Sequence, residues 1–153
     1  MKRRLCTAAG LCRDRRATSA IEFALLVPLF ALMAIGAADF GLVTLDRIRV
    51  QHAAAAAAQE AALRGFNVDE ITKVGSRATS LSSIRFSPPP VESCGCASGA
   101  SITAATCGST CDSGGTAGRY VTVSTQATHA TMFDWPGIPK SFELSTQVTL
   151  RLD

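Results

Sequence analysis

The sequence predicts an α+β protein in which one long N-terminal helix packs on a small antiparallel sheet. The helix is indicated by an apolar segment, Ala20–Val43, that continues into an alanine-rich stretch, Thr44–Arg64, without Pro or Gly. The sheet is indicated by Phe142–Leu152, where apolar and polar residues alternate, and by the β-branched run Tyr120–Thr125. A chain of 153 residues provides one small domain plus such a helix, not two ordinary domains.

The positive charge of the chain is concentrated at its N-terminus. Residues 1–17 contain six Lys or Arg and one Asp, a net charge of +5, whereas the other 136 residues carry −2. A nucleic-acid-binding domain would instead spread its cations over one face, so we expect no nucleic-acid partner. The common nucleotide-binding, hydrolase and metalloprotease motifs are absent from the sequence, and we expect no cofactor.

The apolar segment is long enough to cross a membrane once. Between Ala20 and Val43 the only charged residues are Glu22 and Asp39. These 24 residues span about 36 Å as a helix, which exceeds the ~30 Å hydrocarbon layer of a bilayer. Because the cations lie on the N-terminal side, that end is expected in the cytoplasm and everything after about residue 45 outside the membrane.

Three interpretations of this segment compete. The segment could be a permanent anchor or a secretory signal that is cut before Asp39. Alternatively, it could be the helix of a pilin-type precursor that loses only its cytoplasmic tip. Gly36 and Ala38 are small residues at positions −3 and −1 of the second cut. An uncleaved anchor would leave a membrane-tethered protein with its leader in place.

Glu22 favours the third interpretation, because an acid at this position has a use only there. A cut between Ala17 and Thr18 would make Glu22 the fifth residue of the new chain, on the same helix face as the new α-ammonium group. Pairing of these two charges would offset the cost of holding them in a medium of low dielectric constant. The plainer alternative is an acid at the level of the lipid headgroups, where a charge costs little.

The N-terminal pattern resembles that of TadE-like proteins, the pseudopilins of the tight-adherence (Flp-type) pilus machinery. The resemblance is carried by residues 15–29, RRATSAIEFALLVPL, and by Gly36 and Asp39-Phe40-Gly41 further along. The shared features are a basic pair, a Glu-Phe dipeptide, an apolar run with an early proline and an acid-Phe-Gly motif at the end of that run. The family's processing site is a glycine followed by four residues and then Glu-Tyr or Glu-Phe, and here Ala17 replaces that glycine.

The resemblance implies a pilin-like fold and a non-enzymatic, minor pilin-like membrane component of Tad/Flp pilus assembly. It implies the bacterial inner membrane, with the N-terminus cytoplasmic and the C-terminal domain periplasmic. The implied partners are other pilin-like and Tad assembly proteins, a prepilin peptidase at the Ala17–Thr18 junction, and membrane lipid. The alternative is a secreted or membrane-tethered periplasmic binding or adhesion module, released by the cut before Asp39.

Four parts of the chain are expected. They are a basic cytoplasmic leader over 1–17, a transmembrane helix over 18–43, its external continuation over 44–65, and a periplasmic α+β domain over 66–153 with a Cys-rich loop at 91–118. Gly65 is expected to cap the long helix in the left-handed conformation.

Within the external domain, Asn67 is expected to cap a short helix over 68–79. A short strand is expected at 84–86. The strands at 120–125 and 142–152 are expected to pair antiparallel, with their apolar face against the outer half of the long helix.

The six cysteines fall into two groups. Cys6 and Cys12 lie in the expected cytoplasmic leader and should be reduced. The other four are disulfide candidates, because the compartment beyond the membrane is oxidising: Cys94, Cys96, Cys107 and Cys111. A bond between Cys94 and Cys96 would close a strained small ring, so bridges between the two pairs are favoured.

A Cys₄ zinc site and free thiols are the alternatives. The spacing CxC with CxxxC is a poor match to the usual paired CxxC knuckles of a structural zinc site, and no metal is expected. Many TadE-like proteins carry a Cys-bearing Gly/Ser loop followed by a segment similar to Gly118–Val123, and this resemblance implies disulfides.

No catalytic residue is predicted. His52 and His129 are the only histidines and are far apart in the sequence. The acids Glu92, Asp112 and Asp134 do not have the spacing of a calcium loop.

Overall fold

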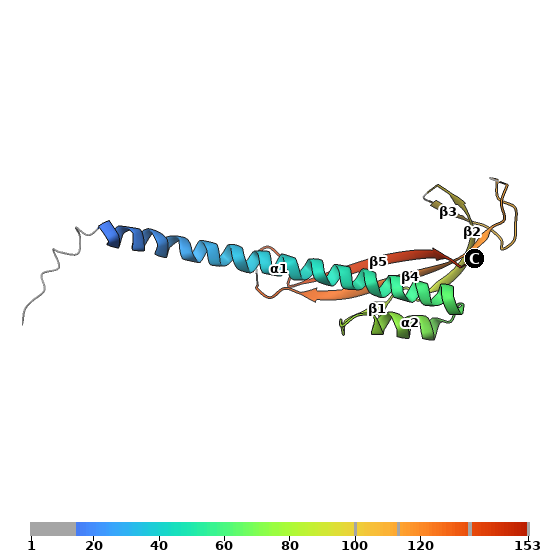
Figure 1. Ribbon diagram of the computed structural model, residues 1–153, viewed down its shortest axis with the longest axis horizontal. Coiled ribbons are helices and arrows are strands. Elements are labelled where there is room, and N and C mark those ends of the chain that lie inside the picture. Colours follow the sequence, from blue (N-terminus) through green and yellow to red (C-terminus); the bar gives the residue numbers. More distant parts are fainter. Residues whose placement is uncertain (1–14, 100, 113, 135, 153) are drawn as a thin grey trace, which may run out of the picture. The chain divides into compact units, whose positions relative to one another are not determined.

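The computed structural model describes residues 15–99, 101–112, 114–134 and 136–152. The first element is a single helix, α1 (Arg15–Arg64), of 50 residues (Figure 1). It begins three residues before the expected start at Thr18. Cys6, Cys12 and most of the expected leader lie outside the described residues.

The chain divides into two compact units, one ending at Phe40 and one beginning at Gly41. The boundary between these two units falls inside α1. The reason is that the outer part of α1 is itself core: Ala53, Ala57 and Ala61 are at most 1% exposed. The helical continuation and the domain after it form one compact unit.

The helix ends follow the sequence expectations. Gly65 has φ +90° and its N–H donates to the Ala61 carbonyl at 3.0 Å, which closes the C-terminus of α1. The second helix, α2 (Val68–Arg77), begins after Asn67, whose side-chain oxygen accepts hydrogen bonds from the Asp69 and Glu70 N–H groups.

A five-stranded antiparallel sheet follows: β1 (Arg85–Phe86), β2 (Val91–Ser98), β3 (Ser101–Ala104), β4 (Gly118–Ala130) and β5 (Ser141–Arg151). The central strand is β4, which pairs with β5 along one edge and with β1 and β2 along the other, while β3 pairs with β2. The predicted pairing of the last two long strands is found, in a register that sets Val123 opposite Val148.

The segment 91–118 differs from the expected loop. It opens with the β2–β3 hairpin, and only the part after Ala104 connects to β4 without a strand of its own. The polar Gly/Ser/Thr composition did not predict these strands. Here β2 is held extended by its pairing with β4 and β3 and by two cross-links, not by burial of apolar side chains.

The core is thin and built on alanine. A buried cluster joins three alanines and an isoleucine of the helices to two valines of β4: Ala57, Ala58, Ala61, Ile71, Val121 and Val123. Half-buried apolar residues of β5, Val148 and Leu150, pack against it. The alanine run thus provides both high helix propensity and a smooth face on which the sheet lies closely.

Candidate functional site

The first candidate site is the apolar segment of α1, Ala20–Val43, which is called the apolar length of α1 below. Among the described residues, this is the one helix long and apolar enough to cross a membrane, and its most apolar window is not buried. Large apolar side chains are exposed all along it, including Phe23 at 68%, Leu25 at 73% and Met33 at 63%. A helix that exposes this much apolar surface requires an apolar environment, which a bilayer or neighbouring helices provide.

Glu22 lies near the beginning of this apolar length and is exposed. Ala17 and Thr18, the residues of the expected processing junction, lie in the first turn of α1. Glu22 is the fourth residue after Thr18, about 6 Å along the axis and close to one turn. An amine at position 18 would therefore lie on the same side of the helix as the Glu22 carboxylate.

The second candidate site is the cross-linked region at the β2–β3 end of the sheet. The structure joins Cys94 to Cys107 and Cys96 to Cys111, over sequence separations of 13 and 15. Both bonds connect the first pair of cysteines with the second. Since all four sulfur atoms are in disulfides, none of them offers a thiolate to zinc.

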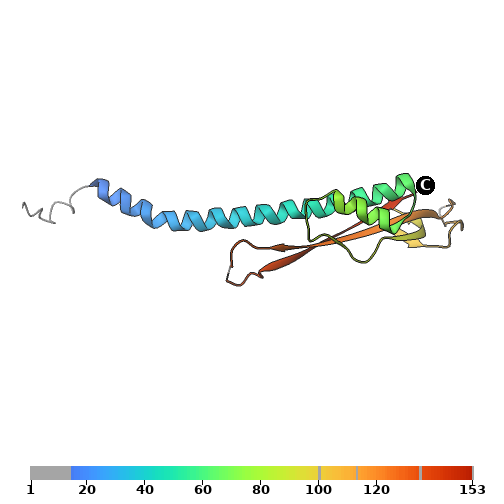
Figure 2. The same ribbon diagram turned by 90° about the horizontal axis from the view of Figure 1, so that it is seen from below.

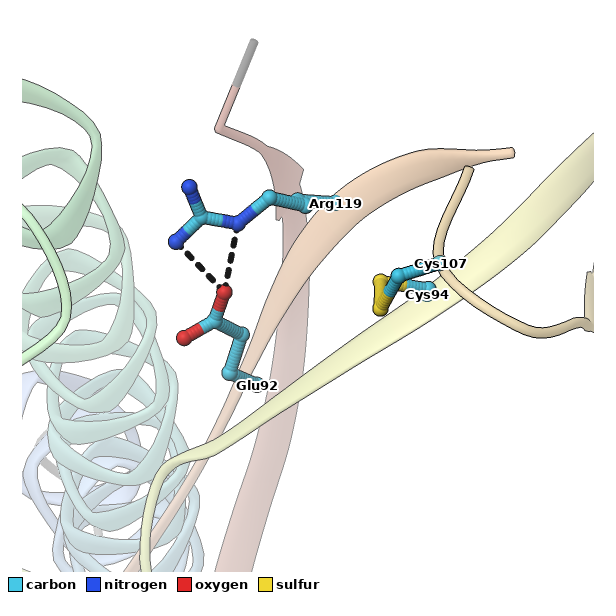
Figure 3. The surroundings of a disulfide bond; sticks show 4 residues. All are labelled: Glu92, Cys94, Cys107 and Arg119. Atoms are coloured by element: carbon cyan, nitrogen blue, oxygen red, sulfur yellow. Dashed lines mark hydrogen bonds and ion pairs between the residues drawn. A yellow bond between two sulfur atoms is a disulfide. The ribbon is translucent and has the colours of Figure 1, made fainter. Parts of the chain in front are cut away.

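An ion pair that the sequence did not indicate lies beside the first disulfide. Arg119 Nε donates to Glu92 Oε1 at 2.7 Å, and its terminal nitrogen lies 2.6 Å from the same oxygen (Figure 3). In the β2–β4 register Cys94 lies opposite Arg119, and Glu92 lies two residues before Cys94 on the same face. Only the strand pairing brings together charges that are 27 residues apart.

A hollow of about 570 Å³ adjoins the second disulfide. It is lined by the β2–β3 hairpin and the segment after it: Cys96, Ala97, Ser98, Gly99, Thr103, Ala104, Ala105, Thr110, Cys111 and Asp112. Among the described residues that line it, the side chains are polar or small, and Asp112 carries a charge.

The two histidines lie in different environments. His52 is exposed on α1, whereas His129 is buried and its Nδ1 lies 2.8 Å from Asp46 Oδ2. Asp46 also accepts a hydrogen bond from Arg49 at 2.9 Å. His129 thus ties β4 to α1, a packing role that its position at a strand end did not reveal. In the part of the chain that the structure describes, no cluster of three His, Cys, Asp or Glu could hold a metal.

These features define a class: an α+β protein with a long, exposed, apolar N-terminal helix and a small antiparallel sheet on the outer half of that helix. Comparison with known families makes the assignment more specific. Residues 17–59 match the family model of the TadE-like proteins, which confirms the resemblance over the apolar helix and its alanine-rich continuation. No curated protein and no solved structure matches the chain.

Proposed function

We propose that the protein is a non-enzymatic, minor pilin-like component of Tad/Flp pilus assembly, anchored in the bacterial inner membrane by residues 18–43. Residues 1–17 form a cytoplasmic leader, and the chain from residue 44 onward, including the domain over 66–153, lies in the periplasm. The single observation that carries the proposal is the coincidence of the TadE-like match with a helix exposing apolar side chains and Glu22.

The proposed mechanism is lateral packing of α1 helices. Removal of the leader between Ala17 and Thr18 by a prepilin peptidase would create an α-ammonium group one turn from Glu22. That carboxylate then pairs with the amine of its own chain or of a packed neighbour. The disulfide-stapled end of the sheet, far along the domain from the membrane, is the surface that docks other Tad components.

The intact mass of the protein, purified from its native membrane without reduction, tests this proposal. The expected chain begins at Thr18 and is lighter by two hydrogens for each disulfide. A chain beginning at Asp39 would establish the alternative, a secreted periplasmic binding or adhesion module, and would contradict the pilin-like proposal. A full-length mass would show an uncleaved tether and remove the amine that the mechanism needs.

Replacement of Glu22 by alanine should abolish or strongly reduce pilus assembly while the protein still inserts in the membrane. The reason is that the substitution removes the partner of the N-terminal amine but makes the spanning segment more apolar. Pilus counts by electron microscopy and the membrane fraction of the variant measure the two effects. A matched control is Glu60→Ala, which removes an acid that pairs with Arg64 outside the expected span. Normal piliation in the Glu22 variant would refute the pairing mechanism.

A further inference from the structure

The loop between β4 and β5 carries an apolar surface separate from the apolar length of α1. Among the described residues of this loop, three large apolar side chains are exposed: Met132 at 73%, Phe133 at 45% and Ile138 at 47%. We refer to Met132, Phe133 and Ile138 as the loop patch. The loop is at the opposite end of the sheet from the β2–β3 hairpin (Figures 1 and 2).

The base of this loop is closed by hydrogen bonds. The Thr131 N–H and hydroxyl both donate to the Lys140 carbonyl, at 3.0 and 3.1 Å. Lys140 also forms an ion pair with Asp134 at 2.6 Å. The loop patch is therefore presented on a hairpin whose ends are held together.

Two contacts fix the direction of β4 along α1. The Thr125 hydroxyl donates to the Val50 carbonyl at 3.1 Å, and His129 Nδ1 lies 2.8 Å from Asp46 Oδ2. From the first contact to the second, the chain advances from Thr125 to His129 on β4 and goes back from Val50 to Asp46 on α1, so the two elements run in opposite directions. Beyond His129, β4 continues toward the N-terminal side of α1 and carries the loop in that direction.

The same contacts set the level of the loop relative to the expected span. Val43, where the span is expected to end, lies three residues before Asp46, about 4.5 Å along the helix axis. Thr131 lies two residues after His129, about 6.6 Å along the strand. The loop therefore begins at the level of Val43, and the loop patch lies at or beyond the membrane boundary predicted from the sequence.

We propose that the loop patch inserts into the headgroup region of the periplasmic leaflet and binds the surface of the bilayer that α1 crosses. Aromatic and large aliphatic side chains on a compact loop suit that region, where a phenyl ring contacts acyl chains and the loop backbone stays hydrated. Arg47, which is exposed on α1 at the same end, suits the anionic headgroups.

This inference rests on the proposed function in one respect only, that α1 spans a membrane. Its consequence is attachment at two points. With α1 and the loop patch both held at the membrane, the external unit keeps one orientation above the bilayer. The disulfide-stapled end is then directed away from the lipid, toward any partner in the periplasm.

Tryptophan quenching in bilayers tests the proposal on the full chain. Trp135 is the only tryptophan, so Trp135→Phe gives a background in which one new tryptophan reports one position. The reporters are Phe133→Trp in the loop patch, Leu32→Trp in the expected span and Ile102→Trp on β3. Each variant is reconstituted in phosphatidylethanolamine–phosphatidylglycerol vesicles without bromine, with bromine on the acyl chains near the headgroup, and with bromine near the ends of the acyl chains, because Leu32 is expected near the middle of the bilayer.

Bromine near the headgroup should quench the tryptophan at 133, bromine near the chain ends should quench the tryptophan at 32, and neither should dim the tryptophan at 102. A bright signal at 133 with quenching at 32 would overturn the proposal, leave the membrane span intact and assign the loop patch to a protein partner. A bright signal at both would contradict the span as well. Equal quenching at 133 and 102 would also overturn it, since the whole unit would then lie on the lipid. Ile138→Trp provides a second reporter if circular dichroism shows that Phe133→Trp is misfolded.

Discussion

Substitution of Gly75 by valine is expected to lower the free energy of unfolding of the external unit by about 3 kcal/mol, the upper part of the usual range for overpacking. Gly75 is on α2 where that helix crosses α1. A Cβ at position 75 would lie 2.5 Å from the Phe86 ring and 2.9 Å from both the Ala53 carbonyl oxygen and the Ala57 Cβ. The ring can rotate away, but the α1 backbone cannot move without separating it from the sheet.

Thermal unfolding of the full chain in detergent, followed by circular dichroism, measures this effect. For a unit of this size, about 3 kcal/mol corresponds to a fall in Tm of about 10 °C or more. The matched control is Gly115→Ala, because a Cβ at position 115 meets no atom within 4 Å. Equal Tm values for the Gly75 variant and the wild-type protein would show that α2 does not pack closely on α1.

Removal of the second disulfide by Cys96→Ser with Cys111→Ser is the other large effect that we expect. The bond spans 15 residues, and opening a loop of that length costs about 3 kcal/mol of stability. The loss should be concentrated at the β2–β3 hairpin, because within the described chain β3 pairs with β2 alone and the residues of β3 are exposed. The β4–β5 pair and the alanine core should persist.

Limited proteolysis and thermal unfolding together check this expectation. The variant should be cleaved within 98–117 under conditions in which the wild-type protein is intact, and the core should then unfold at a moderately lower temperature. Reduction of the wild-type protein should reproduce the cleavage. Reduction of a variant that lacks the four disulfide-bonded cysteines should not change its cleavage pattern. Resistance of the double variant to protease would show that strand pairing alone holds the hairpin.

Local features of the sequence determined the helices and the two long strands. The absence of Pro and Gly over 44–64 predicted the continuous helix, and Gly65 and Asn67 marked the helix ends, because capping depends on residues adjacent in the chain. The period of two over 142–152 predicted a strand with one face on the core, since alternation follows directly from backbone geometry. The pattern around Glu22 likewise predicted the TadE-like match.

The tertiary structure alone decided which distant residues meet. The pairing of Cys94 with Cys107, the Glu92–Arg119 ion pair and the His129–Asp46 contact depend on strand register and on how the sheet lies along α1. Local propensity carries no information about contacts separated by 13 to 83 residues, because these form only when the core closes. The same closure placed β4 antiparallel to α1, and so brought the apolar β4–β5 loop to the level of Val43.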